Sequence, residues 1–225
     1  MPLTLDIETV PLAASMAAEY PLNDFAPPAN YKAPDAIVNW HDRNAKDWAA
    51  KREKECSVNP RLGRILCFGY ASGRSLGETL YAETEADEPQ LLRDAWALIA
   101  SHGGRVVTWN GGFDLRFLVI RSLAHGILPY VDAVTIRAWF RKYDVFTHYD
   151  VKAVLMNWDV RATGEGLDEW AKFFGLPGKP DGVDGGIVAF MYRDGNHEAI
   201  REYCISDVAN TKAMYEKTVA FFGGN

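Results

Sequence analysis

The chain has 225 residues, of which 48% are hydrophobic, and its formal net charge is −6. This length suits one large domain or two small ones, with enough apolar side chains for a sizeable core. The acidic balance argues against a protein that holds nucleic acid on a broad basic surface. It does not exclude a nuclease, because bound divalent cations would supply the positive charge that meets phosphate.

The sequence shows no sign of a membrane or secreted protein. No segment approaches the ~20 apolar residues of a membrane span, and the N-terminal residues lack the basic region of a signal peptide. The three cysteines, Cys56, Cys67 and Cys204, match neither a disulfide framework nor zinc-ligand spacing. We therefore expect a protein of the reducing cytoplasm with no membrane association.

Three strands and a helix are expected in the first part of the chain. Residues 3–7 form a short apolar segment typical of a buried strand. A helix should begin near Pro34, because proline suits the first helical turn, and it should end before Pro60. Residues 64–71 and 78–83 are apolar segments that predict two further strands.

Strands and helices alternate in the rest of the chain. An amphipathic pattern predicts a helix over residues 88–101. A strand over 105–109 and a helix over 113–125 follow, and then helices over 151–158, 167–174 and 196–222, with a glycine-rich loop at 175–186. This order indicates an α/β fold with a mixed central sheet flanked by helices.

Asp6 and Glu8 are the first candidate functional residues. They lie two residues apart on the first expected strand, so both side chains should share one face. Two carboxylates about 5 Å apart repel by roughly 3 kcal/mol at an effective dielectric constant near 20, and a divalent cation would remove this cost. A lone D-x-E pair more commonly lies at a solvated strand end.

Asp114 and Asp207 are two further candidate functional residues. Asp114 closes the segment Asn110-Gly111-Gly112-Phe113-Asp114, between an expected strand and helix. Favourable interaction with the helix N-terminus would explain Asp114 alone. Asp207 follows Tyr203 by four residues, on what should be the packed face of the last helix. The alternative for Asp207 is a buried carboxylate bonded to a distant donor.

Taken in order, these three segments resemble the three motifs of the DEDD superfamily of 3′–5′ exonucleases, which has a ribonuclease H-like fold. Tyr203 fits the tyrosine branch, because the sister branch has histidine where this chain has Glu202. The chain is similar over nearly its whole length to a bacterial and phage group of predicted exonucleases related to the proofreading domain of family B DNA polymerases. Residues 60–71, 148–151, 167–179 and 203–208 also carry this similarity.

The resemblance implies two Mg²⁺ or Mn²⁺ ions that clamp the scissile phosphate. Asp6 would bridge both ions, and Glu8 and Asp207 would complete the site of one of them. Asp114 would hold the other ion, and Tyr203 would orient the attacking water. The product would be a nucleoside 5′-monophosphate released from the 3′ end of single-stranded DNA.

The resemblance also implies a single domain over residues 1–225, with an insertion at about 10–62 that contains a helix. Thr9 is a candidate substrate contact, and replication or repair proteins are candidate partners. From their place beside Asp114, we hypothesise that Asn110 and Phe113 shape the pocket for the terminal nucleotide, although plain core packing explains Phe113 equally well. We further hypothesise that the helix of the insertion guides single-stranded nucleic acid, with Trp40 and Trp48 as stacking surfaces. Packing of these tryptophans onto the domain is the stronger alternative.

Two other functions remain open at this point. An exoribonuclease of the same superfamily would use the same acids, because only a contact to the 2′-OH distinguishes the two sugars. A non-catalytic nucleic-acid-binding module on this fold would be expected to lose at least one acid. We also hypothesise that the loop at 175–186 closes over the substrate with Lys179 facing phosphate, although a passive surface loop is the slightly stronger explanation of its glycines.

Overall fold

The structure of the protein is a computed structural model, which describes residues 1–17, 26–159, 166–178 and 187–223. The strands are β1 (Leu3–Pro11), β2 (Gly63–Ala71), β3 (Glu78–Tyr81), β4 (Val106–Thr108) and β5 (His148–Asp150). The longer helices are α2 (Pro34–Ser57), α3 (Glu88–Ser101), α4 (Gly111–Ala124) and α9 (His197–Phe222). The shorter helices are α1 (Ala13–Ala17), α5 (Ala133–Trp139), α6 (Val151–Leu155), α7 (Leu167–Phe173) and α8 (Val188–Arg193).

The five strands form one mixed sheet in the order β3-β2-β1-β4-β5. β1, β2 and β3 are antiparallel neighbours, whereas β4 runs parallel to β1 and β5 parallel to β4. β1 pairs with β4 only at Leu3 and Thr4. The β4 side of β1 is therefore open to other elements beyond Thr4, and this opening positions the candidate site.

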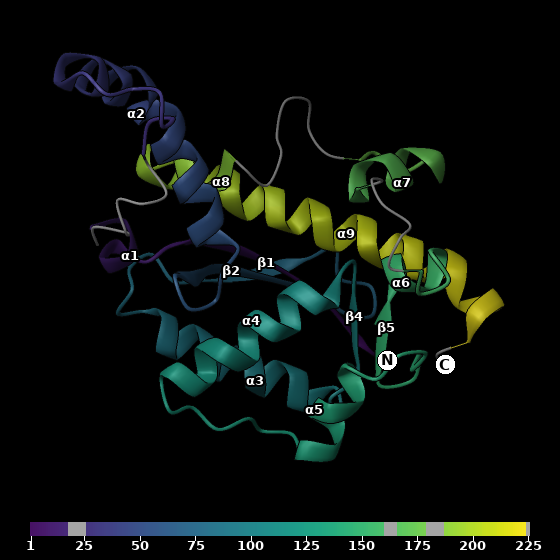
Figure 1. Cartoon of the computed structure of the whole chain (residues 1–225). Helices are drawn as coiled ribbons and strands as arrows, with labels where there is room; N and C mark the ends of the chain where they lie inside the picture. The colour runs from purple at the N-terminus through teal and green to yellow at the C-terminus, as the bar shows by residue number, and fades with distance from the viewer. Residues whose placement is uncertain (18–25, 160–165, 179–186, 224–225) are drawn as a thin grey trace.

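Helices cover both faces of the sheet (Figure 1), with α3 and α4 on one face and α9 along the other. Leu3, Leu5 and Ile7 of β1 belong to the core cluster that includes residues of α3 and α4. Val10 instead packs with Ile200, Tyr203 and Cys204 of α9. Because alternate residues of a strand face opposite sides, Asp6 and Glu8 lie on the face that α9 covers.

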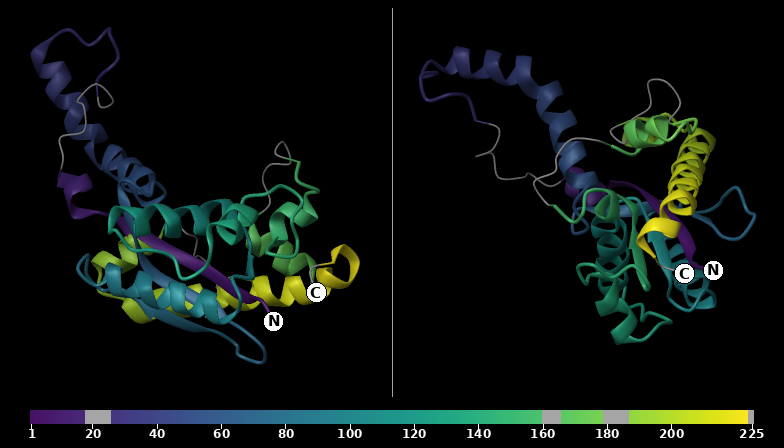
Figure 2. Two further views of the ribbon diagram at one scale, coloured as in Figure 1. Left: turned by 90° about the horizontal axis from the view of Figure 1, so that it is seen from below. Right: turned by 90° about the vertical axis from the view of Figure 1, so that its right-hand side faces the viewer.

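α2 differs from the other helices because it projects from the body of the domain (Figure 2). Only its C-terminal half carries buried residues, Arg52 and Cys56. The cation-π contact of Trp48 is with Arg52, at 5.2 Å from the ring centroid, and Trp40 packs edge-on against the neighbouring His41. Both tryptophans are half-buried, and their proposed stacking with bases stays a hypothesis.

The structure confirms the predicted α/β class and most of the expected elements. α3 has the predicted bounds, and β1, β2 and α9 differ from prediction only at their ends. The helix expected over 151–158 is shorter, because Asn157 and Trp158 adopt positive φ angles of 48° and 53°. α1, α5, β5 and α8 were not expected, and each has seven residues or fewer.

Two further expectations concern membrane-spanning helices and the loop at 175–186. Across the described residues, each helix is too short or too polar to pass through a bilayer. Of the loop expected at 175–186, residues 175–178 have no regular structure, whereas Lys179 and the rest lie outside the described residues.

Candidate active site

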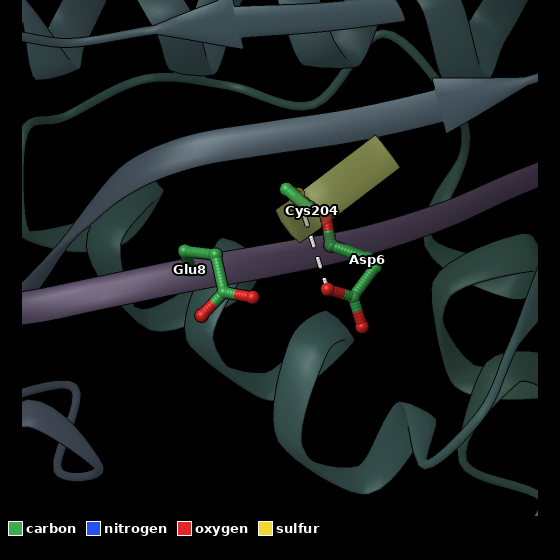
Figure 3. A group of neighbouring side chains, drawn as sticks. All are labelled: Asp6, Glu8 and Cys204. Atoms are coloured by element: carbon green, nitrogen blue, oxygen red, sulfur yellow. Dashed lines mark hydrogen bonds between the residues drawn. The ribbon is translucent and has the colours of Figure 1, made fainter. Parts of the chain in front are cut away.

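Asp6 and Glu8 place their carboxylates on the same side of β1, as the strand spacing predicts (Figure 3). Their oxygen atoms and the thiol of Cys204 lie within 4.8 Å of one another. Glu8 is only 7% exposed, so it is not at a frayed, solvated strand end. The two acids therefore form a compact carboxylate pair partly enclosed by α9.

Asp114 joins this pair from the first turn of α4. Its Oδ1 accepts a hydrogen bond from the backbone N–H of Ile7, at 3.1 Å. Ile7 stands between Asp6 and Glu8 on the part of β1 that lacks β4 as a partner. Departure of β4 after Thr4 thus opens the strand edge, and the carboxylate of Asp114 occupies it. Asp114 therefore contacts β1 and does not only interact with the N-terminus of its own helix.

The environment of Asp114 disfavours a negative charge. Burial raises the pKa of this carboxyl to about 7, and the nearby charges of Asp150 and Asp207 add to the effect. The hydrogen bond from the Ile7 amide acts in the opposite direction but is too weak to compensate. A cation bound among these acids would reverse the balance, because an opposite charge within about 4–6 Å favours the ionised form.

α9 brings the second pair of predicted residues, Tyr203 and Asp207, to the same face. Asp207 is 5% exposed and Tyr203 is 3% exposed. The approach depends on Gly69 of β2, which pairs with Asp6 in the sheet. A Cβ atom at Gly69 would lie 2.6 Å from Sγ of Cys204 and 2.9 Å from a methyl group of Val208. A larger residue there would hold α9 away from the carboxylates.

Cys204 is a neighbour of the site that the sequence did not reveal. Its thiol donates weak hydrogen bonds to the backbone oxygen of Asp6, at 3.8 Å, and to Oδ2 of Asp6, at 3.9 Å. A hydrogen bond with Cys67, burial and the charges of Asp6 and Glu8 raise the pKa of the Cys204 thiol well above its ordinary value. Without a bound cation, the thiol therefore stays protonated.

Asp150, at the end of β5, is a second neighbour of the site. Its Oδ1 accepts the N–H of Ala153 and so caps α6. Its Oδ2 also accepts the N–H of Gly111, at 2.9 Å, and so holds the start of α4 beside β5. A Cβ at Gly111 would come within 2.3 Å of the His148 ring, so this contact requires glycine.

Two clefts lie beside the first turn of α4. The first, of about 610 Å³, is lined by Glu8, Thr9 and Phe113 together with residues of α2 and α8. The second, of about 490 Å³, is lined by Asn110, Gly112, Asp150 and residues near them. The three candidate substrate-binding residues thus line clefts, but Asn110 lies in a different cleft from Thr9 and Phe113.

The donor atoms fit a hard divalent cation. Three elements, β1, α4 and α9, bring carboxylates together, and oxygen ligands of this kind suit Mg²⁺ or Mn²⁺. Of the four predicted acids, the structure groups Asp6 and Glu8 as possible ligands of one ion. Asp114 reaches this strand through the Ile7 amide and lies near Asp207, and the part of these two acids in holding an ion stays a prediction.

Comparison with known proteins gives one family match. The model of a family described as "Predicted 3'-5' exonuclease related to the exonuclease domain of PolB" matches residues 70–224. This range includes Asp114, Tyr203 and Asp207, whereas Asp6 and Glu8 precede it. No curated protein matches the chain at a significant level.

Among solved structures, the chain is similar to the family B DNA polymerase from the hyperthermophilic archaeon Pyrobaculum calidifontis, with a TM-score of 0.61 and 17% sequence identity. The match covers 97% of this chain and 24% of the polymerase chain, so this protein spans only a minor part of that enzyme's length. The similarity establishes the fold, and it confirms the ribonuclease H-like arrangement that the sequence predicts.

Proposed function

Because the chain belongs to the family of predicted 3′–5′ exonucleases related to the exonuclease domain of PolB, we propose that it is a metal-dependent exonuclease. Its substrate would be the 3′ end of single-stranded DNA, and its product a nucleoside 5′-monophosphate. The observation that carries this proposal is the convergence of buried carboxylates from β1, α4 and α9 beside a cleft.

Asp6, Glu8, Asp114 and Asp207 would hold two divalent cations, Mg²⁺ or Mn²⁺. Such ions neutralise phosphate charge and lower the pKa of a water nucleophile. The chain supports this role by keeping the acids in place: the Ile7 amide orients Asp114, and the Cys204 thiol contacts Asp6. These contacts fix the side chains on regular elements, which hold a geometry better than loops do.

Thr9, Phe113 and Asn110 would bind the substrate. Thr9 and Phe113 line the larger cleft together with Glu8, so a terminal nucleotide there would lie against the carboxylates. The ring of Phe113 offers a surface on which a base can stack without sequence preference. Asn110 lines the second cleft and would contact the nucleic-acid strand there.

Tyr203 would position the reacting groups rather than bind the strand. Its side chain is buried and packs beside Val10, Leu66 and Val188. This packing fixes the ring on the face of α9 that also carries Asp207. A Tyr203→Phe change would therefore test the hydroxyl group alone, with little loss of packing.

The direct test is digestion of a single-stranded DNA oligonucleotide labelled at either end. With Mg²⁺ or Mn²⁺, the 5′-labelled strand should shorten progressively, and the 3′-labelled strand should release labelled mononucleotide at once. EDTA and the Asp207→Asn variant should each stop both reactions. Internal cleavage, or equal digestion in EDTA, would contradict the proposal.

A matched RNA oligonucleotide should accompany the DNA. The acids and cations do not distinguish the two sugars, because discrimination needs a contact to the 2′-OH. We propose DNA as the preferred substrate. Faster digestion of the RNA would assign the protein as an exoribonuclease that uses the same site.

A further inference from the structure

The wall of the larger cleft that faces away from the domain core is made by α2. The cleft is lined by Ile7, Glu8 and Thr9 of β1, by Ala50, Glu53, Lys54 and Ser57 of α2, and by Val58, Phe113 and Ala189. α2 lies in the segment between β1 and β2, before residues 70–224 that the family model matches. A contact from α2 to substrate would therefore be a property that the family match does not supply.

The part of α2 that lines the cleft is anchored to the domain. Thr9 Oγ1 donates a hydrogen bond to the backbone oxygen of Ser57, at 2.7 Å. Arg52 is 8% exposed and donates to the backbone oxygen of Ser15, and Cys56 is 1% exposed. These contacts hold the C-terminal half of the helix beside β1, while the N-terminal half projects outward (Figure 2).

The two charged residues of this wall have different surroundings. Glu53 forms an ion pair with Arg193 of α8, which links the two helices that border the cleft and neutralises the acid. Lys54 is exposed and forms no ion pair or side-chain hydrogen bond with any residue that the structure describes. The wall therefore presents one available cation to the cleft, opposite the acidic face of β1.

This charge pattern matches a nucleic-acid strand better than a free cation or a neutral ligand. The aromatic ring of Phe113 suits a base, the carboxylate of Glu8 lies where a cation would meet the reacting phosphate, and Lys54 suits another phosphate. Lysine is a common phosphate partner as a compact point charge. The cleft volume of about 610 Å³ falls in the range of small-molecule sites and has room for a nucleotide.

We propose that the C-terminal half of α2 forms the outer wall of the nucleotide cleft and that Lys54 pairs with a phosphate of the bound single strand. The inference rests on the proposed exonuclease function for the identity of the strand. It shifts the expected nucleic-acid contact of this helix away from Trp40 and Trp48, toward the anchored end that borders Glu8.

The test compares Lys54→Gln with Lys51→Gln. Lys51 lies on the same helix, is exposed, pairs with Glu55 at 3.8 Å and does not line the cleft. Both variants lose one positive charge, so a general change in net charge would affect them equally. Because both side chains are exposed, the two variants should unfold at the same temperature as the unaltered protein.

Binding is measured by fluorescence anisotropy with a 5′-fluorescein oligodeoxythymidylate in Ca²⁺, at several salt concentrations. Lys54→Gln should weaken binding about three- to tenfold, as expected for one lost charge-assisted phosphate contact. The slope of log affinity against log salt should become shallower by about 0.7, the value for one phosphate of a single strand. Lys51→Gln should change the affinity less than about twofold, the usual scale for an exposed charge.

Three results would overturn the inference: equal affinity of Lys54→Gln and the unaltered protein, equal weakening by both variants, or no binding by the unaltered protein. Failure of the proposed function would look different, because the unaltered protein would then bind the oligonucleotide but not degrade it in Mg²⁺ or Mn²⁺. Steady-state digestion provides a second readout, in which Lys54→Gln should raise KM and leave kcat within about twofold.

Discussion

Two buried carboxylates, Glu88 and Asp114, accept a hydrogen bond from a strand amide in the same way but have opposite surroundings. Glu88 Oε1 accepts the N–H of Ile65 at 2.8 Å, and Asp114 Oδ1 accepts the N–H of Ile7 at 3.1 Å. Glu88 also bonds to Arg121 Nη2, at 2.7 Å, and to His125. Asp114 instead lies near two further acids, Asp150 and Asp207.

The two pKa shifts express this difference. Burial opposes ionisation at both sites, but the hydrogen bonds from Arg121 and His125 outweigh it and lower the pKa of Glu88. At Asp114 burial prevails, and neighbouring negative charges raise the pKa further, to about 7. A carboxylate neutralised by the protein itself stabilises the fold, whereas clustered acids of this kind indicate a place for an external cation.

The largest expected difference between Asp114 and Glu88 is in exonuclease activity. Asp114→Asn keeps the size of the side chain but removes a charge from the proposed cation site, so the exonuclease rate should fall by at least about 10²-fold. Glu88→Gln should retain most of the rate per folded molecule, since Glu88 lies outside the site. Rates are measured on the labelled oligonucleotides, normalised to folded protein by circular dichroism. Comparable losses of rate in Asp114→Asn and Glu88→Gln would contradict the distinction between a cation-binding carboxylate and a structural one.

The next effect is on stability, for which Glu88 should matter more than Asp114. Glu88→Ala leaves the guanidinium of Arg121, only 7% exposed, without its partner. Breaking a buried pair from one side costs about 3–5 kcal/mol, which in a domain of this size lowers Tm by roughly 10 °C. The double variant Glu88→Met with Arg121→Met should recover much of the loss. A Tm unchanged in Glu88→Ala would show that the pair is not structural.

A smaller effect should appear in the metal-free protein. The pKa of Asp114 is raised on folding, so its contribution to stability falls as pH increases from about 4 to about 7. Asp114→Asn cannot ionise, and in EDTA it should be more stable than the unaltered protein by roughly 1 kcal/mol at pH 8. The difference should shrink at pH 5. Urea unfolding at the two pH values measures it, and a variant less stable at pH 8 would contradict the account.

The sequence predicted correctly those helices and strands whose hydrophobic pattern extends over many residues. α3 could be predicted to the residue because its apolar positions recur at helical spacing and Gly103 and Gly104 follow it. α5 and α8, with seven and six residues, complete too few turns to show a period. β5 has three residues and is recognisable only by its pairing with β4.

The same limit applies to the site. The acids on β1, α4 and α9 could be proposed from their order along the chain, but not their mutual placement. That placement depends on the early departure of β4 from β1 and on the space above Gly69 that admits Cys204. Asp150 is likewise joined to the site by the hydrogen bond that it accepts from the amide of Gly111, 39 residues earlier in the chain. No local pattern encodes such contacts.

The proposed function depends on one claim, that the acids of β1, α4 and α9 bind divalent cations together. Calorimetric titration of Mn²⁺ into the unaltered protein, Asp114→Asn and Glu88→Gln tests it without any substrate. We predict saturable binding to the unaltered protein and to Glu88→Gln, and binding at least about tenfold weaker to Asp114→Asn. Equal Mn²⁺ affinity in all three proteins, or no binding at millimolar Mn²⁺, would contradict the claim.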